Sequence, residues 1–348
     1  MMRSACSRFC RWLVPAIVAG CQENVPPQAP PSQPYYPQPA PYYGPPAPYA
    51  QPPPVPEAPP PVYGSVPAPP QNQAQVQAPR PLLGALVGPL AWQAEVRAVE
   101  IELIGRLSAQ NRVRVVNVPL VFDPNPNEVN AFAGCDDGGA PFVAATEGLL
   151  EAIDAISQTR STDELYGTKT YGAYVGATAP RMVSQGGGRA ALPAGILPAQ
   201  ALVDVRRISR AHEMFDEIVG FTFGHELAHH YLGHTGCANG QAAGLGPALE
   251  QLGRIVTNFG NVFNQPNEIA ADSAGCVNVL YAGLARAPVA YRWSEAGGLA
   301  LLDFFAALER ASGANPLLGI LRTHPNPGLR IPIVQGVATT WRLQHPGL

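Results

Sequence analysis

The 348-residue sequence predicts an α+β domain, mainly helical, over residues 82–348. First, segments with a helical spacing of apolar residues dominate this part of the chain. Second, only three short segments, all between residues 112 and 145, have the alternation or composition of strands. Third, the first 81 residues are too rich in proline to build a core, whereas the rest is long enough for one.

The predicted strands are short and close together. Residues 112–121 alternate and are β-branched, and residues 130–133 and 141–145 indicate two further strands. The Gly- and Asp-rich residues 134–139 have the composition of a hairpin turn between the last two. We therefore expect a small sheet rather than an extended one.

Helices account for most of the remaining domain. An apolar stripe through Val96, Val99 and Leu103 predicts the first helix. Residues 166–198 are rich in Gly and Ala without a clear period, and we expect a long loop or lid there. The predicted helices span residues 90–109, 147–157, 201–234, 268–284, 294–312 and 327–335.

The first 21 residues have the order of an export signal. Three arginines lie among the first eleven residues, and a short apolar run, too short to span a bilayer, follows them. The end, Ala19-Gly20-Cys21, resembles a bacterial lipobox, in which residues 1–20 are removed and Cys21 is lipidated. The resemblance implies the outer membrane, because Gln22 stands after the cysteine where retention in the inner membrane requires Asp. The alternative is an ordinary signal peptide with an incidental cysteine.

Residues 21–81 are predicted to be a disordered tether. They hold more than half of the 40 prolines and almost no charge, which favours an extended polyproline-like chain. Such a segment would space a lipid anchor from the folded domain. The alternative is a docking site, because pairs such as Tyr35-Tyr36 lie among the prolines.

Charge and cysteines limit the partners and the covalent links. A net charge of -3 without basic runs argues against a nucleic-acid partner. No segment after the signal has the apolar length of a membrane span. An exported chain permits one disulfide among Cys135, Cys237 and Cys276 and leaves one thiol over, and the sequence does not select the pair.

The most informative motif is His225-Glu226-Leu227-Ala228-His229. On an α-helix the two histidines are four residues apart and project from one face, so that both imidazoles can reach one metal ion. Glu226 points about 100° round the helix, where it can act as a general base without being a ligand. Zinc peptidases have this arrangement. The alternative is an amphipathic helix with surface histidines.

We expect the third metal ligand on a later helix. A third histidine close behind the motif is excluded, because Leu232 and Thr235 stand where glycine and histidine would be required. Glu268 and Asp272 are four residues apart and therefore share a helical face. Glu268 can bind the metal, while Asp272 accepts a hydrogen bond from a ligand histidine.

The neighbouring histidines are expected to play no part in metal binding. His230 and His234 lie off the ligand face by helical geometry, which favours structural or surface roles. His212-Glu213-x-x-Asp216 is a near miss of the motif that lacks the second histidine, and we expect it on the surface.

Four segments in one order resemble a family of zinc metallopeptidases. This is the gluzincin-type family that contains HtpX, the CAAX prenyl protease and periplasmic lipoprotein endopeptidases. The resemblance covers roughly residues 112–335, apart from the Gly/Ala-rich stretch. Because this chain lacks spanning helices, it is most similar to the periplasmic branch. The four segments are an Asn-Ala-Phe strand, a zinc helix, a glutamate-ligand helix and a late His-Pro segment, at residues 130–133, 225–234, 268–272 and 323–331.

The resemblance implies a zincin-like domain with a small sheet beside the zinc helix. It implies zinc bound by His225, His229 and Glu268, with Glu226 as the general base. It also implies that His324 stabilises the tetrahedral intermediate, although His324 before proline is alternatively a turn residue.

The resemblance further implies how substrates bind. Asn130, Ala131, Phe132 and Ala133 would form an edge strand that pairs with the backbone of a polypeptide substrate. Asn130 alternatively only terminates the strand through its side chain.

The implied activity is that of a zinc-dependent endopeptidase. It would hydrolyse misfolded or envelope proteins on the periplasmic side of a bacterial envelope, in protein quality control, while a lipid anchors it to the outer membrane. The alternative is a lipid-tethered chaperone or scaffold that retains the fold without catalysis.

Overall fold

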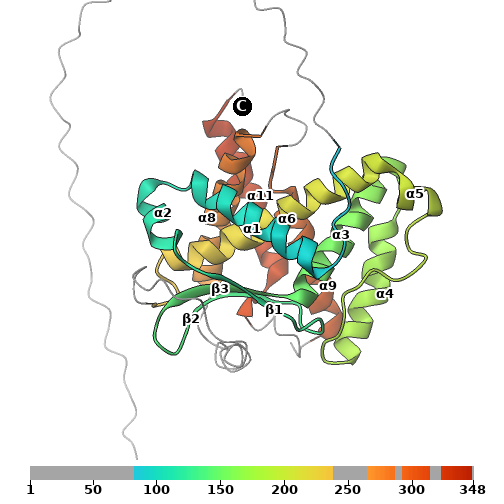
Figure 1. The fold of residues 1–348 in the computed structure, drawn as a ribbon, viewed down its shortest axis with the longest axis horizontal. Helices are drawn as coiled ribbons and strands as arrows, with labels where there is room; N and C mark the ends of the chain where they lie inside the picture. The colour runs from blue at the N-terminus through green and yellow to red at the C-terminus, as the bar shows by residue number, and fades with distance from the viewer. Residues whose placement is uncertain (1–81, 238–264, 287–291, 314–322, 347–348) are drawn as a thin grey trace, which may run out of the picture. The chain divides into compact units, whose positions relative to one another are not determined.

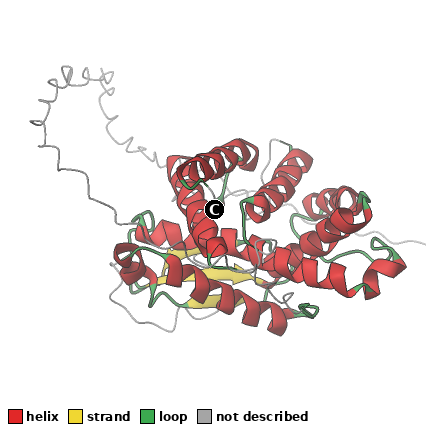
Figure 2. Ribbon diagram, turned by 90° about the horizontal axis from the view of Figure 1, so that it is seen from above, coloured by secondary structure: helices red, strands yellow, loops and turns green. Residues whose placement is uncertain are grey.

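The computed structural model describes residues 82–237, 265–286, 292–313 and 323–346. Helices dominate these residues, and one small sheet lies along one side of them, so the predicted mainly helical α+β class is confirmed (Figures 1 and 2). The predicted export signal, the lipidated Cys21 and the tether over residues 21–81 lie outside the described residues. Among the described helices, none combines the length and the apolar composition that crossing a bilayer requires.

Helix α6 (Val205–Tyr231) is the central element of the domain. The Asp204 carboxylate accepts a hydrogen bond from the Arg206 N–H and so caps its first turn. Every residue from Glu213 to Tyr231 is buried, because other elements pack round the helix on all sides. The main helices that contact it are α1 (Pro89–Arg106), α3 (Glu147–Tyr166), α8 (Gln265–Leu284) and α9 (Ala296–Ser312).

The sheet has the order β1-β3-β2. Strand β1 (Leu120–Asp123) runs parallel to β3 (Pro141–Thr146), and β2 (Ala131–Cys135) pairs antiparallel with β3. Gly139 adopts a φ of 81° in the hairpin between β2 and β3, a conformation that favours glycine. Strand β2 lies at an edge of this sheet, as the resemblance implies, and both β2 and β3 contact α6.

The structure selects the disulfide that the sequence leaves open. Cys135 at the end of β2 pairs with Cys237, shortly after α6. Cys276 on α8 is the remaining thiol and is buried. The disulfide therefore links the edge strand to the chain that leaves the central helix.

The strand predicted over residues 112–121 is wrong for its first half. Residues Ala109–Val115 form helix α2, and the strand begins only at Leu120. The Ser108 side chain accepts a hydrogen bond from the Asn111 N–H and caps the helix. The Arg112 guanidinium donates to carbonyls at the end of α1. These local bonds outweigh the strand preference of the valines in this segment.

The predicted loop or lid over residues 166–198 is also wrong for half its length, because Thr170–Ser184 forms helix α4. The Asp163 carboxylate accepts hydrogen bonds from the backbone N–H groups of Thr170 and Tyr171 at its start. Tyr174 and Met182 are buried against the core. The small residues between them carry too little apolar surface to give a clear period.

The remaining helices lie where the sequence predicts, with some boundaries shifted. Helix α3 continues to Tyr166 rather than ending at residue 157, and ends before Gly167, whose φ is 65°. The helix expected over 327–335 extends to Gln344. The last two elements are α5 (Ala199–Val203) and α11 (Pro327–Gln344).

The predicted surface position of His212-Glu213-x-x-Asp216 is wrong. Glu213 and Asp216 are buried, and His212 is half-buried. Helix α1 packs on α6, and its residue Glu95 lies 3.3 Å from His212. These residues of the central helix therefore lie against a neighbouring helix rather than in solvent.

Candidate metal centre

The candidate site lies where helices α6 and α8 cross. A Cβ built on Gly275 of α8 would lie 2.7 Å from the His225 backbone nitrogen and 2.9 Å from the Gly224 carbonyl carbon. The two backbones can therefore approach this closely only because glycine stands at the crossing. This contact brings Glu268 of α8 to the two histidines of α6. Gly275 was not among the predicted site residues, since its role depends on tertiary packing.

His225, His229 and Glu268 converge with the spacing of metal ligands. The two Nε2 atoms are 3.0 Å apart. Glu268 places one carboxylate oxygen 3.5 Å from His225 Nε2 and the other 3.3 Å from His229 Nε2. Tetrahedral zinc with ligands at about 2.05 Å has ligand–ligand separations of about 3.3 Å. All three side chains are buried.

Asp272 fixes the orientation of His225. Its Oδ1 lies 2.9 Å from His225 Nδ1, which therefore carries the hydrogen and leaves Nε2 with a lone pair toward His229. Arg330 donates twice to the same carboxylate, over 2.7 Å each. Burial alone would raise the pKa of Asp272, but the Arg330 guanidinium holds it below its usual value.

His229 has a matching arrangement with a different partner. Its Nδ1 lies 3.0 Å from Nδ1 of His234, in the turn that follows α6. Burial lowers the pKa of His229 to about 3, so the imidazole is neutral, as a metal ligand must be. His234 is thus in contact with a candidate ligand, which helical geometry alone did not indicate.

His230 has a structural role, one of the alternatives that the sequence indicates. Its Nε2 lies 2.9 Å from the Phe142 carbonyl oxygen, and its Nδ1 lies 3.2 Å from the Thr235 hydroxyl. Burial lowers the pKa of His230 to about 4. The residue therefore joins α6 to β3 as a neutral imidazole and takes no part in the centre.

Glu226 and His324 lie beside the three candidate ligands. Glu226 Oε1 is 3.4 Å from His324 Nε2, and Glu226 Oε2 is buried without a hydrogen bond from the described residues. His324 Nδ1 lies 3.0 Å from Glu268, and its Nε2 lies 3.0 Å from the Ala131 carbonyl oxygen. Burial raises the pKa of Glu226, whereas the two carboxylates overcome the burial of His324 and raise its pKa to about 9.

Arg330 of α11 is a site residue for which the sequence gave no role. It is buried, and its Nη1 lies 3.0 Å from Glu268 Oε2 while its other nitrogens bind Asp272. It therefore positions both acidic side chains of α8. Its position within the His-Pro segment, six residues after His324, was the available signal.

The predicted substrate strand, residues 130–133, lies next to the candidate metal centre. The Thr146 N–H donates to the Asn130 carbonyl, so the Asn130 backbone faces β3. By alternation, the backbone groups of Ala131 and Ala133 face the opposite edge of β2. The Ala131 carbonyl is the one that His324 contacts.

The side chains of this strand are buried and support it. The Asn130 amide oxygen accepts a hydrogen bond from the Thr323 hydroxyl, which fixes the residue before His324. Phe132 packs edge-to-face on Phe142 of β3. Asn130 thus does more than terminate a strand, because it connects β2 to the His-Pro segment.

These residues have the chemistry of a metal-binding group. Two imidazole nitrogens with inward lone pairs and a carboxylate meet at one point, and mutual repulsion among them would be relieved by a cation. The buried group of His225, His229, Glu268 and His324 could therefore hold a metal ion. Comparisons of this chain with protein-family profiles, with curated proteins and with solved structures gave no match.

Proposed function

We propose that the protein is a zinc-dependent endopeptidase, similar to the gluzincin-type family described above. The observation that carries the proposal is the convergence of two histidine nitrogens and a glutamate at separations of 3.0–3.5 Å, with a second buried glutamate beside them. Bound zinc would supply Lewis-acid polarisation of the scissile carbonyl and would activate water.

Glu226 is the general base of the proposed reaction. One of its oxygens is buried and accepts no hydrogen bond from the described residues, so it is available for a proton. It would take that proton from the attacking water and pass it to the leaving amine. Phe221, Leu301 and Phe305 line an apolar pocket beside it, which lowers the local dielectric and strengthens these interactions.

His324 and Arg330 complete the proposed machinery. His324 carries positive charge between Glu226 and Glu268 and would stabilise the oxyanion that develops on the substrate. Arg330 and Asp272 hold Glu268 and His225 in place, so the ligands need little reorganisation.

The proposed substrate is a polypeptide in extended conformation. Its backbone would pair with the Ala131 and Ala133 groups on the edge of β2. This mode reads little side-chain identity and suits misfolded or envelope proteins. In the proposed setting, a lipid on Cys21 anchors the protein to the outer membrane, and residues 22–81 space the domain from it on the periplasmic side.

Hydrolysis of an unfolded protein such as casein tests the proposal. Glu226→Gln should retain bound zinc and the unfolding temperature but lose at least about a hundredfold in rate, since an amide cannot accept the proton. Glu309→Gln on α9 is the matched control and should cleave like wild type. Equal rates for Glu226→Gln and wild type would contradict the assignment. A wild type that suppresses aggregation without cleavage would indicate the chaperone instead.

A further inference from the structure

A second group of metal-ligating side chains lies apart from the centre described above. Glu95 of α1 and His212 and Asp216 of α6 place one donor atom each within 4.8 Å of one another. His212 precedes His225 by 13 residues, which is about 20 Å along an α-helix. The two groups therefore cannot share an ion.

His212 is oriented as metal-binding histidines are. Its Nδ1 lies 2.8 Å from the Gly84 carbonyl oxygen, so that Nδ1 carries a hydrogen and donates it. Its Nε2 then faces Glu95 Oε2 at 3.3 Å and Asp216 Oδ1 at 3.9 Å. The first separation equals the spacing of about 3.3 Å expected for ligands round a tetrahedral zinc ion, and the second exceeds it by about 0.6 Å.

Asp216 provides an independent observation. The residue is 2% exposed, and its Oδ1 accepts no hydrogen bond from any described residue. That oxygen lies 3.9 Å from His212 Nε2, among the donor atoms of this group. A buried carboxylate oxygen is costly unless a hydrogen or a cation lies against it.

The arginine nearest to this group is shared with another carboxylate. Arg286 of α8 approaches Asp216 Oδ2 at 3.6 Å, but two of its nitrogens already bind Glu102 at 2.9 and 2.7 Å. The Arg286–Glu102 pair is neutral as a unit. Glu95 and Asp216 therefore face only His212 and a guanidinium that is shared with Glu102, so protons or one divalent cation would neutralise the two acidic side chains.

We propose that Glu95, His212 and Asp216 form a second binding site for a divalent metal ion of the zinc type. One imidazole nitrogen among carboxylates disfavours Mg²⁺ and Ca²⁺, which prefer oxygen ligands alone. Glu95 is half-buried, and its side chain is 27% exposed, which provides a path for the ion from solvent. The proposal does not depend on peptidase activity.

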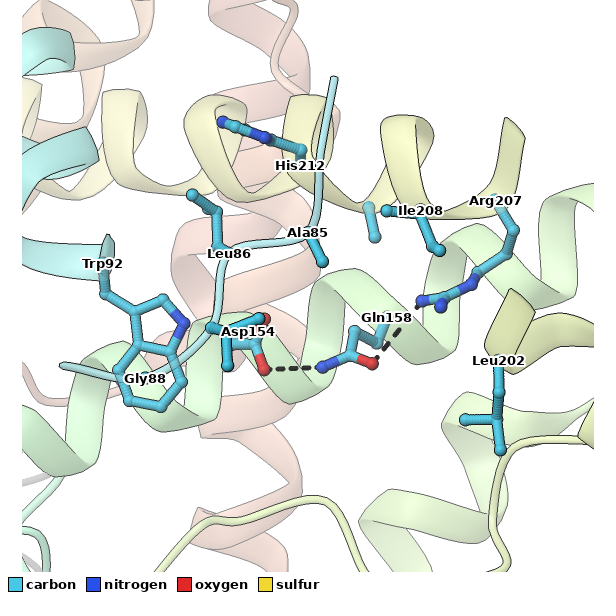
Figure 3. A pocket seen from close by; sticks show the side chains of 12 residues that line it. Ala85, Leu86, Gly88, Trp92, Asp154, Gln158, Leu202, Arg207, Ile208 and His212 are labelled. Carbon is cyan, nitrogen blue, oxygen red and sulfur yellow. Dashed lines mark hydrogen bonds between the residues drawn. The ribbon is translucent and has the colours of Figure 1, made fainter. Parts of the chain in front are cut away.

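The ion would have a structural role at the start of the domain. His212 lies beside Ala85 and Leu86 on the wall of a cavity of about 320 Å³, where the chain before α1 crosses α6 (Figure 3). The Leu83 N–H donates to the Ser209 hydroxyl at 3.0 Å in the same region. A metal bound here would join α1 and the preceding segment to the helix that carries the first centre.

Zinc binding to the full chain, measured by equilibrium dialysis, tests the second site. Wild type should bind two equivalents, and Glu95→Gln should bind one. The matched control Glu309→Gln should bind two. His225→Ala/His229→Ala should retain one equivalent, which is lost when Glu95→Gln is added. If the first centre binds no zinc and the second site does, wild type should bind one equivalent, and Glu95→Gln should bind none.

Two results would overturn the proposal. One is the complete loss of zinc binding in His225→Ala/His229→Ala. This result would mean that a proton on His212, or one shared by the two carboxylates, takes the place of the metal ion. The other is a second equivalent that survives both Glu95→Gln and Asp216→Asn. X-ray absorption of zinc in the His225→Ala/His229→Ala protein should show one imidazole ligand, and two would also contradict the assignment.

Discussion

Replacement of Gly275 by alanine should distort the candidate metal centre without touching a ligand. The added Cβ would lie 2.7 Å from the His225 nitrogen, about 0.7 Å inside the 3.4 Å at which ordinary contact begins. The neighbouring atoms are backbone, so α8 must move away from α6 by a similar distance. Metal–ligand distances tolerate only about 0.2 Å, and Glu268 moves with α8.

The expected result is a loss of both metal affinity and stability. Overpacking costs about 1–3 kcal/mol, partly offset by about 1 kcal/mol from the helix preference of alanine. Zinc affinity, measured by competition with a chromophoric chelator, should fall at least about tenfold. Gly336→Ala on α11 is the control, because nothing lies within 4 Å of its added Cβ. A Gly275→Ala protein with wild-type zinc affinity and unfolding temperature would refute the reasoning.

Three further predictions address other residues. His324→Ala should lower kcat for casein cleavage much more than it raises KM, because the proposed role of the imidazole is to stabilise the oxyanion. An unchanged kcat would leave His324 as a turn residue. Ala133→Pro should raise KM for extended substrates, because it removes an N–H that faces away from β3, and unchanged KM would exclude pairing along β2. Glu100→Gln should change the pH dependence of unfolding. Burial raises the pKa of Glu100 to about 7, so its contribution to stability is complete below about pH 4.5 and is lost as pH rises through 7. The variant should match wild type at pH 4 and exceed its stability by up to about 3 kcal/mol at pH 8, and equal stability at both pH values would contradict the burial argument.

The sequence predicts those parts of the centre that depend on spacing along one helix. His225 and His229 share a face because they are four residues apart, and the same holds for Glu268 and Asp272. The hydrogen bond between Asp272 and His225, and the approach of Glu268 to both histidines, follow once the two helices cross. Helical periodicity was sufficient for this because side-chain direction is fixed by local geometry.

Residues whose role depends on tertiary packing could not be predicted in this way. Arg330 reaches α8 only because α11 packs against it, and Gly275 matters only because α6 passes within contact distance. Glu95 meets His212 only through the packing of α1 on α6. No local pattern encodes these three contacts.

Two segments were assigned wrongly because local bonds outweighed composition. The valines before Leu120 favoured a strand, but the Ser108 cap and the Arg112 hydrogen bonds stabilise a helical turn instead. In the Gly/Ala-rich stretch, the carboxylate of Asp163 initiates α4. Such caps are visible in the sequence only when the position of the helix end is already known.

Anomalous diffraction at the zinc absorption edge tests most directly whether the centre binds metal. Crystals grown with zinc should show a peak about 2.0–2.2 Å from His225 Nε2, His229 Nε2 and a Glu268 carboxylate oxygen. Crystals of Glu268→Ala should lose that peak or show it much weakened, because a three-ligand centre has no spare ligand. A folded wild-type protein without a peak at these three residues would contradict the assignment of the metal centre.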